Sequence, residues 1–197
     1  MARILILFIS VLILICVSGC AIRPASEENL TGNYSDVGTV TLSVGQPAIG
    51  FSLPDANGEI VSLASVLRQQ DVLLIFYRGD WCPYCLDQFS TIQPVLPELK
   101  SYGVTLLAVS PDEQSAALNT QRRFGQDYRF LSDRSLVITR QYGIDSVKGL
   151  PHPAVFLIRK GVSIEQSEVV WMYVSQDHKT RPIGEQLLKQ VQRLFKR

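Results

Sequence analysis

Long apolar runs alternate with segments of mixed polarity along most of the chain. Three runs have almost no polar position, at 72–77, 104–109 and 154–158. This composition is typical of strands that are buried on both faces of a sheet. A fourth apolar run, at 169–174, follows the third after a short turn. The spacing predicts a strand that returns beside its predecessor.

Segments with helical patterns lie between and after these strands. They cover residues 82–102, 112–124, 133–142 and 183–195. In the first of them, Pro94 and Pro97 are expected to kink the helix or to end it early. Further upstream, the pair Asn57-Gly58 between two short apolar segments predicts a hairpin. Strands that alternate with helices predict an α/β fold, with a central mixed sheet flanked by helices on both faces.

The first 20 residues have the pattern of an export signal. Arg3 precedes an apolar run over 4–17, and small residues follow the run. At 14 residues the run is shorter than a membrane-spanning helix, although an uncleaved N-terminal anchor is the alternative. The end of the run resembles a bacterial lipoprotein processing box. The resemblance implies a signal peptide over 1–19, a lipid on Cys20, and a protein anchored in the cell envelope that faces the periplasm.

The chain then divides into a tether and one folded domain. Residues 20–43 are polar and have no clear period, which favours a flexible tether. The alternative is an ordered arm packed on the domain. Tyr34 and the alternation of polar and apolar residues over 39–44 would allow it. Residues 44–197 are predicted to form the folded domain.

Composition narrows the possible functions. Of 197 residues, 46% are hydrophobic, so the chain can bury a core. The formal net charge is only +1 and basic residues form no block, which argues against nucleic acid as a partner. Once the signal peptide is removed and Cys20 carries its lipid, two free thiols remain, Cys82 and Cys85. In an oxidising compartment these can form a disulfide.

The two thiols lie where a buried strand leads into a helix. Cys82 falls at the helix start, where free N–H groups and the helix dipole stabilise an anion. The pKa of Cys82 should therefore be lowered, and we expect its sulfur to be within reach of solvent. Pro83 suits the first helical turn. Cys85 lies one turn further, on the same face and less exposed, where it can resolve a mixed disulfide.

Two other interpretations of the cysteine pair are possible. A structural disulfide would close so small a loop that it would remove little chain entropy. A closed metal site needs about four ligands, and only His152 and His178 could join the two cysteines. We therefore expect no metal and no organic cofactor, because the dithiol itself carries electrons.

Several motifs resemble those of a known family. The stretch from Trp81 to Cys85 is similar to the active-site motif of thioredoxin-fold proteins, and the wider frame resembles the peroxiredoxin-like branch of the alkyl hydroperoxide reductase/thiol-specific antioxidant family. The motifs are Gly45-Gln46-Pro47, Phe51-Ser52-Leu53-Pro54-Asp55, the segment 76–85 and Leu107-Ala108-Val109-Ser110-Pro111-Asp112. The resemblance covers residue 44 to the C-terminus and implies a thioredoxin-like fold.

The resemblance also implies a cis-proline that faces the cysteines. Pro153, directly before the third core strand, matches that position, and Pro151 is a second candidate. His152 would then lie near the sulfurs and could stabilise the thiolate or move protons. Its alternative role is that of a partly exposed loop histidine.

The sequence departs from ordinary peroxiredoxins in front of the nucleophile. Those enzymes carry Thr or Ser three residues before the reactive cysteine and Pro four residues further back. Here these positions are Gly79 and Ile75. The hydroxyl that would orient a peroxide is therefore missing from its usual place.

Three residues near the cysteines are further candidates for the site. Arg78 could stabilise a thiolate or a bound peroxide, or it could simply pair with Asp80. Trp81 and Tyr84 could form an apolar surface for a docking partner, or the indole could pack into the domain.

Together these features predict a thiol–disulfide oxidoreductase that serves redox homeostasis in the cell envelope. Cys82 is the expected nucleophile and Cys85 the resolving thiol. The expected partners are protein thiols or disulfides, or a reducing thioredoxin-like donor, with the lipid bilayer contacted through Cys20. One alternative is a thiol-dependent peroxidase that reduces hydroperoxides. Another is a non-catalytic module that holds a metal or a partner.

Overall fold

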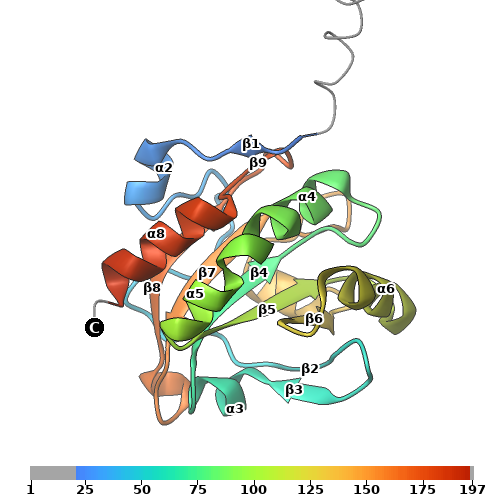
Figure 1. Ribbon diagram of the computed structural model, residues 1–197, viewed down its shortest axis with the longest axis horizontal. Helices are drawn as coiled ribbons and strands as arrows, with labels where there is room; N and C mark the ends of the chain where they lie inside the picture. The colour runs from blue at the N-terminus through green and yellow to red at the C-terminus, as the bar shows by residue number, and fades with distance from the viewer. Residues whose placement is uncertain (1–20, 196–197) are drawn as a thin grey trace, which may run out of the picture.

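A five-stranded mixed sheet forms the centre of the molecule (Figure 1). The computed structural model describes residues 21–195. The strands, in spatial order, are β6 (Tyr128–Ser132), β5 (Val104–Ser110), β4 (Asp71–Phe76), β7 (Ala154–Arg159) and β8 (Glu168–Val174). The first three run parallel, whereas β7 is antiparallel to both β4 and β8. The predicted mixed sheet and its closing hairpin are confirmed.

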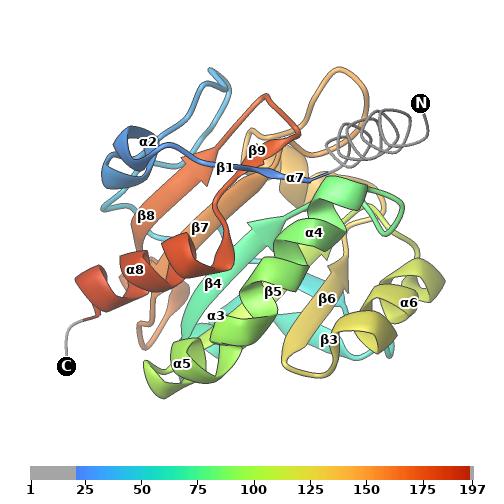
Figure 2. The ribbon, with the colours of Figure 1, turned by 45° about the horizontal axis from the view of Figure 1, so that its top comes forward.

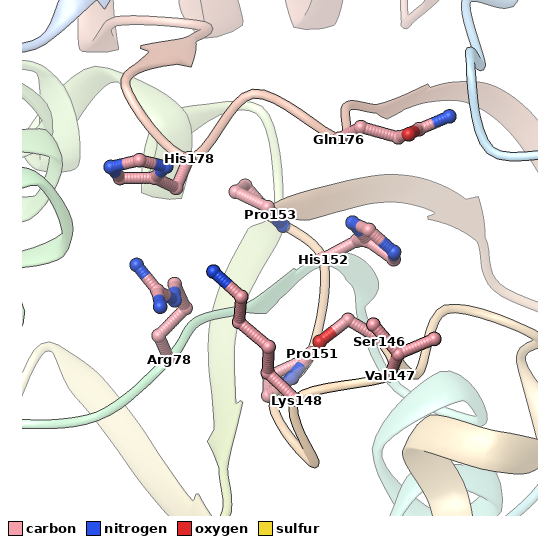
Figure 3. A pocket seen from close by; sticks show the side chains of 9 residues that line it. All are labelled: Arg78, Ser146, Val147, Lys148, Pro151, His152, Pro153, Gln176 and His178. Atoms are coloured by element: carbon pink, nitrogen blue, oxygen red, sulfur yellow. The ribbon is translucent and has the colours of Figure 1, made fainter.

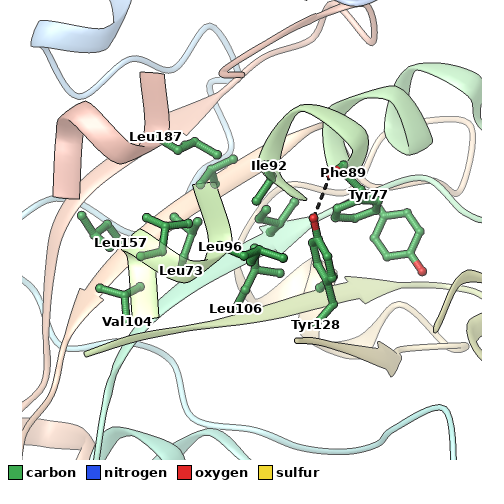
Figure 4. Packing of buried hydrophobic residues seen from close by; sticks show 14 of the residues in the cluster. Leu73, Tyr77, Phe89, Ile92, Leu96, Val104, Leu106, Tyr128, Leu157 and Leu187 are labelled. Carbon is green, nitrogen blue, oxygen red and sulfur yellow. Dashed lines mark hydrogen bonds between the residues drawn. The ribbon is translucent and has the colours of Figure 1, made fainter. Parts of the chain in front are cut away.

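The edge strand β6 is missing from the sequence prediction. Its five residues include Arg129 and two hydroxyl side chains, so it lacks the continuous apolar run that marks its neighbours. Tyr128 and Phe130 are nevertheless buried and pack around Phe89. The Tyr128 hydroxyl donates a hydrogen bond of 2.8 Å to the Phe89 carbonyl (Figure 4). Burial of these aromatic side chains ties β6 to the helix that carries the cysteines.

Helices cover both faces of the sheet, as predicted (Figure 2). One face is covered by α4 (Pro83–Ile92), α5 (Leu96–Ser101), α6 (Gln114–Phe124) and α8 (Gly184–Leu194), and the other by α3 (Leu63–Leu67) and α7 (Val137–Gln141). The predicted helix 82–102 is divided by a 3-10 turn at Gln93–Val95. The division comes at Pro94 and Pro97, whose rings cannot continue a regular helix.

Local side-chain bonds set two of the turns. The predicted hairpin consists of β2 (Ser52–Pro54) and β3 (Ile60–Ser62), and the Asp55 carboxylate accepts bonds from two backbone N–H groups inside it. Helix α7 begins at Val137, later than predicted, because Leu136 has a positive φ of 55°. The Asp133 carboxylate caps this helix and accepts from the N–H groups of its first turn.

The segment after residue 20 differs from the predicted flexible tether. Strand β1 (Arg23–Pro24) pairs in parallel with β9 (Thr180–Arg181), and helix α2 (Glu27–Thr31) follows it. The indole N–H of Trp171 donates a hydrogen bond of 2.9 Å to the Leu30 carbonyl. The part of the segment that the structure describes is an ordered arm on the domain, the alternative that Tyr34 allowed.

A few apolar side chains at irregular spacing explain why the arm is ordered. The buried ones are Ala25, Leu30, Val37 and Leu42. Each fills one core position, so the segment is anchored without showing any regular period. The predicted signal peptide and Cys20 lie outside the described residues. Between residues 21 and 195, no helix is both long enough and apolar enough to cross a membrane.

Two glycines test whether the arm is packed in solution. Gly143 has φ 66°, and a Cβ there would lie 1.9 Å from the Thr39 carbonyl oxygen in the arm, whereas Gly149 has φ 65° with open space around it. We expect Gly143→Ala to lower the free energy of unfolding by about 3 kcal/mol and Gly149→Ala by only about 1 kcal/mol. Urea denaturation measures both. Equal losses would show that the arm does not pack there.

Candidate active site

The two cysteines lie at the start of α4, close to the end of the central strand β4. Cys82 is the N-cap residue of the helix and Pro83 occupies the first turn. The Cys82 carbonyl accepts hydrogen bonds from the N–H groups of Cys85 and Leu86, at 3.0 and 3.1 Å. Both cysteines are free thiols. The structure thus places the pair one helical turn apart, at the positive end of the helix dipole.

The sulfur of Cys82 is not within reach of solvent, contrary to our expectation. Cys82 is 1% exposed and Cys85 is 0% exposed. The Arg181 side chain, from β9, lies against the Cys82 sulfur, and β1 pairs with that strand. The cover is thin, since β1 and β9 contain two residues each. A substrate can reach the sulfur only when part of this cover opens.

The surroundings of the pair divide the roles of the two thiols. A hydrogen bond from the Cys85 thiol, together with the charges of Arg181 and Arg78, lowers the pKa of Cys82 to about 6, although burial opposes the shift. Burial raises the pKa of Cys85 well above that of an ordinary thiol. At neutral pH, Cys82 is therefore a thiolate and Cys85 a protonated donor to it.

Arg181 is a site residue that sequence reasoning missed. It is 0% exposed, and its Nη2 lies 3.9 Å from the Cys82 sulfur. Its other donors bind the His178 carbonyl at 3.0 Å and the Gln88 Oε1 at 3.3 Å. No carboxylate in residues 21–195 forms a salt bridge with it. A buried cation needs an anion nearby, and the Cys82 thiolate is the group that supplies it.

The loop before Cys82 is held by a buried carboxylate that was also missed. Asp112 accepts hydrogen bonds from the Asp80 N–H at 3.0 Å and from the Ser110 hydroxyl at 2.9 Å. Gly79 has φ 142°, and a Cβ there would lie 2.8 Å from Asp112 Oδ1 and 2.6 Å from the Trp81 ring nitrogen. A Thr or Ser at this position would have to displace the Trp81 and Asp112 side chains, and the positive φ would strain it. The departure noted in the sequence is therefore built into the loop.

Arg78 links the loop to the sulfur of Cys85. Its N–H donates to the Cys85 sulfur at 3.5 Å. Its guanidinium stacks over the Trp81 ring at 5.1 Å, so the alternative pairing with Asp80 is not observed. Trp81 is 57% exposed and does not pack into the domain. The Tyr84 ring meets the His178 ring edge-on at 5.4 Å, which extends the aromatic border of the site.

The expected cis bond before Pro153, and its alternative before Pro151, are wrong. No peptide bond in the described part of the chain is cis. The trans form is the lower-energy state of such bonds by about 0.5–1 kcal/mol. Backbone hydrogen bonds hold the loop in this form: His152 N–H donates to the Ile144 carbonyl at 2.8 Å, and the Pro153 carbonyl accepts from Ser175 N–H at 3.1 Å.

His152 lies near the site without touching the sulfurs. It lines a cavity together with Arg78 and Pro153 (Figure 3) and makes no hydrogen bond to either cysteine. Burial lowers the pKa of His152, so the ring is neutral at pH 7. In residues 21–195, no three side chains of the metal-binding types come together.

Comparison with known proteins identifies the family. The family model described as AhpC/TSA family matches residues 44–167, more than half of the chain. The chain belongs to the AhpC/TSA family. The resemblance seen in the motifs around Cys82 is thereby confirmed.

The similar proteins include thiol-disulfide oxidoreductases and peroxiredoxins. Thiol-disulfide oxidoreductase ResA of Bacillus subtilis is 29% identical over 148 residues, covering 75% of this chain and 74% of the relative. The chloroplastic peroxiredoxin Q of Triticum aestivum is 27% identical over 173 residues, covering 86% and 76%. The chain is thus similar to enzymes of both kinds, and it is itself an enzyme that acts as a thiol oxidoreductase or peroxidase.

A solved structure supports the fold. Peroxidoxin BcpB from Mycobacterium tuberculosis superposes with a TM-score of 0.65 and 21% sequence identity, covering 78% of this chain and 98% of that chain. At this identity the likeness concerns the fold alone. The AhpC/TSA chain has the thioredoxin-like fold that its motifs predicted.

Proposed function

We propose that this AhpC/TSA protein is a thiol–disulfide oxidoreductase in which Cys82 attacks and Cys85 resolves. The observation that carries the proposal is the environment of the Cys82 sulfur. It accepts a hydrogen bond from Cys85 and faces the buried Arg181, which has no carboxylate partner in residues 21–195. Such a site stores a nucleophilic thiolate next to a second, protonated thiol.

The reaction with a disulfide substrate follows from these two protonation states. The Cys82 thiolate attacks one substrate sulfur, so that a mixed disulfide forms and the other sulfur leaves as a thiolate. Cys85 then gives up its proton, which passes to the departed thiolate, and attacks the Cys82 sulfur. The second substrate sulfur leaves and takes a proton from solvent. The substrate gains two electrons and two protons, and the enzyme ends with the Cys82–Cys85 disulfide. The reverse sequence returns the dithiol.

Access to the sulfur requires local opening. Two backbone hydrogen bonds join β1 to β9, from Arg23 N to Lys179 O at 2.9 Å and from Ala25 N to Arg181 O at 3.0 Å. Other contacts also hold the arm, among them bonds of 2.8 Å from Ile22 N to the Asp87 carboxylate and from the Gln186 amide to the Ala25 carbonyl. An edge pair of two-residue strands still opens at lower free-energy cost than the sheet unfolds. We propose that its displacement admits the substrate.

A peroxidase activity is the second candidate function. The similarity to a peroxiredoxin Q favours it, and a thiolate of pKa about 6 could attack a peroxide. The loop argues against it, because Gly79 supplies no hydroxyl where peroxiredoxins carry one, and its positive φ disfavours any other residue there. The geometry therefore favours disulfide exchange.

Stopped-flow oxidation of the reduced protein separates the two functions. We expect a neutral small disulfide to oxidise Cys82 much faster than it oxidises a free thiol at the same pH, because the thiolate is largely formed and Cys85 is in place. Hydrogen peroxide should react no faster with Cys82 than with a free thiolate. Fast oxidation by peroxide together with slow oxidation by the disulfide would reverse the assignment.

We further propose that the enzyme works in the cell envelope, held by a lipid on Cys20. The lipoprotein-like segment 17–20 supports this location. Because the arm packs on the domain from Arg23 onward, few residues would separate the lipid from the fold. Mass spectrometry tests the proposal: the protein from the membrane fraction should begin at Cys20 and carry a lipid there, and an unmodified chain that begins at Met1 would contradict it.

A further inference from the structure

A small cavity opens beside the dithiol at the junction of three loops (Figure 3). Its volume is about 180 Å³, and its wall includes Arg78, Lys148, His152, Pro153 and His178. Arg78 comes from the loop before the cysteines, Lys148 and His152 from the segment before β7, and His178 from the segment before β9. In Figure 3 the side chains of Arg78, Lys148 and His178 approach the same space from different sides.

The lining of this cavity is cationic. Its nine residues include Arg78 and Lys148 but no carboxylate, and neither cation forms a salt bridge with another described residue. The carboxylates whose charges raise the pKa of His152 are Asp36 and Asp145, which lie outside the lining. Asp36 accepts hydrogen bonds from Tyr34 Oη at 2.9 Å and Gln176 N at 2.7 Å. The cavity wall therefore carries net positive charge, although the charge of Asp177 acts on His178 and that of the Cys82 thiolate on Arg78.

The two histidines add hydrogen-bonding groups rather than charge. Burial lowers the pKa of both rings, and the nearby Arg78 charge contributes at His178. Neutral imidazoles can donate one hydrogen bond each. Two cations with neighbouring N–H donors are groups that can bind a carboxylate.

Size and position indicate what part of a ligand enters. A cavity of about 180 Å³ is smaller than the pockets of roughly 300–1,000 Å³ that enclose whole drug-sized ligands. It can hold one end group of a larger molecule. Arg78 belongs to the cavity wall, and its backbone N–H donates a hydrogen bond of 3.5 Å to the Cys85 sulfur. An end group held here would keep the rest of the molecule beside the dithiol.

We propose that this cavity binds the carboxylate of a small disulfide substrate and thereby selects anionic disulfides. The inference rests on the proposed function, since it names the substrate class of the same dithiol. The carboxylate would lie between Arg78 and Lys148, and the disulfide would extend toward Cys82. A small molecule suits the buried sulfur, which only a limited opening of its cover exposes.

Oxidation rates of the reduced full-length protein test the proposal. Dithiodipropionate serves as the anionic disulfide and hydroxyethyl disulfide as the neutral one, and each rate is divided by the rate with a free thiol. We expect the anionic disulfide to be favoured in the wild-type protein. Lys148→Gln should lower the anionic-to-neutral ratio about fivefold, as expected when one partly solvated charge is removed. Lys148 is exposed, so its replacement should not disturb folding.

Lys160→Gln is the matched control. Lys160 is exposed and lies beyond the opposite end of β7 from Pro153, so this change should leave the ratio as it is in the wild type. Equal ratios in all three proteins, with the neutral disulfide still reacting faster than background, would overturn the proposed selectivity and leave the exchange function standing. If neither disulfide reacts faster with the reduced protein than with a free thiol, both the proposed exchange function and the proposed selectivity are wrong.

Discussion

Replacing Cys82 by serine is expected to lower disulfide exchange at least roughly a thousandfold, to the background rate, because the attacking thiolate is lost. Cys85 cannot take over, since its pKa is raised well above that of an ordinary thiol and it is fully buried. The measurement is the oxidation rate of the reduced variant by hydroxyethyl disulfide, compared with the wild type.

Cys85→Ser is the matched control for this experiment. A serine hydroxyl can still donate a hydrogen bond to the Cys82 sulfur, so the first attack should persist. Without a resolving thiol, the mixed disulfide between Cys82 and half of the substrate should accumulate and be visible by mass spectrometry. Comparable activity of Cys82→Ser and the wild type would show that the CxxC pair is not the reacting group.

Replacing Arg181 is expected to have the second largest effect. An opposite charge within about 4–6 Å of an acid lowers its pKa by roughly 1 to 3, so Arg181→Met should raise the pKa of Cys82 from about 6 by that amount. Below the new pKa most of the thiolate is protonated, so the exchange rate at pH 6 should fall by roughly fivefold for a shift of 1 and by roughly fiftyfold for a shift of 2. The pH profile of the exchange rate measures the shift, whose midpoint should move to higher pH.

Two further variants separate charge from packing at Arg181. Arg181→Lys keeps a cation and should keep the pKa of Cys82 below its value in Arg181→Met. A purely structural role of Arg181 would make the two substitutions lower the exchange rate equally. Arg122→Met, the same substitution at an exposed position of α6, should leave the profile as it is. If the folded Arg181→Met protein keeps the midpoint of the wild-type pH profile, Arg181 does not lower the pKa of Cys82.

Short-range patterns in the sequence predict most of the fold and the position of the nucleophile. The central strands are continuous apolar runs, and Cys82-Pro83 carries the signals of a helix start. These features depend on neighbours in the chain. For the same reason the two prolines after residue 92 indicate where the long helix is interrupted.

Features that depend on distant contacts could not be predicted in this way. Arg181 meets Cys82 across 99 positions of sequence, and Asp112 reaches Asp80 across 32. Nothing in the local pattern around Arg181 distinguishes it from a surface charge, and the motif that ends at Asp112 does not show which backbone group its carboxylate binds. The ordered arm is similar: Leu30 is buried because Trp171, far along the chain, bonds its carbonyl. The burial of Cys82 also follows from such a long-range contact.

The pH dependence of Cys82 alkylation tests the central claim most directly. Reduced full-length protein is treated briefly with iodoacetamide at a series of pH values, and the label on Cys82 is quantified by tandem mass spectrometry. A thiolate held by Cys85 and Arg181 predicts a rate that rises with a midpoint at about pH 6 and is level above about pH 8. A midpoint near 9, the value of an unperturbed thiol, would contradict the account.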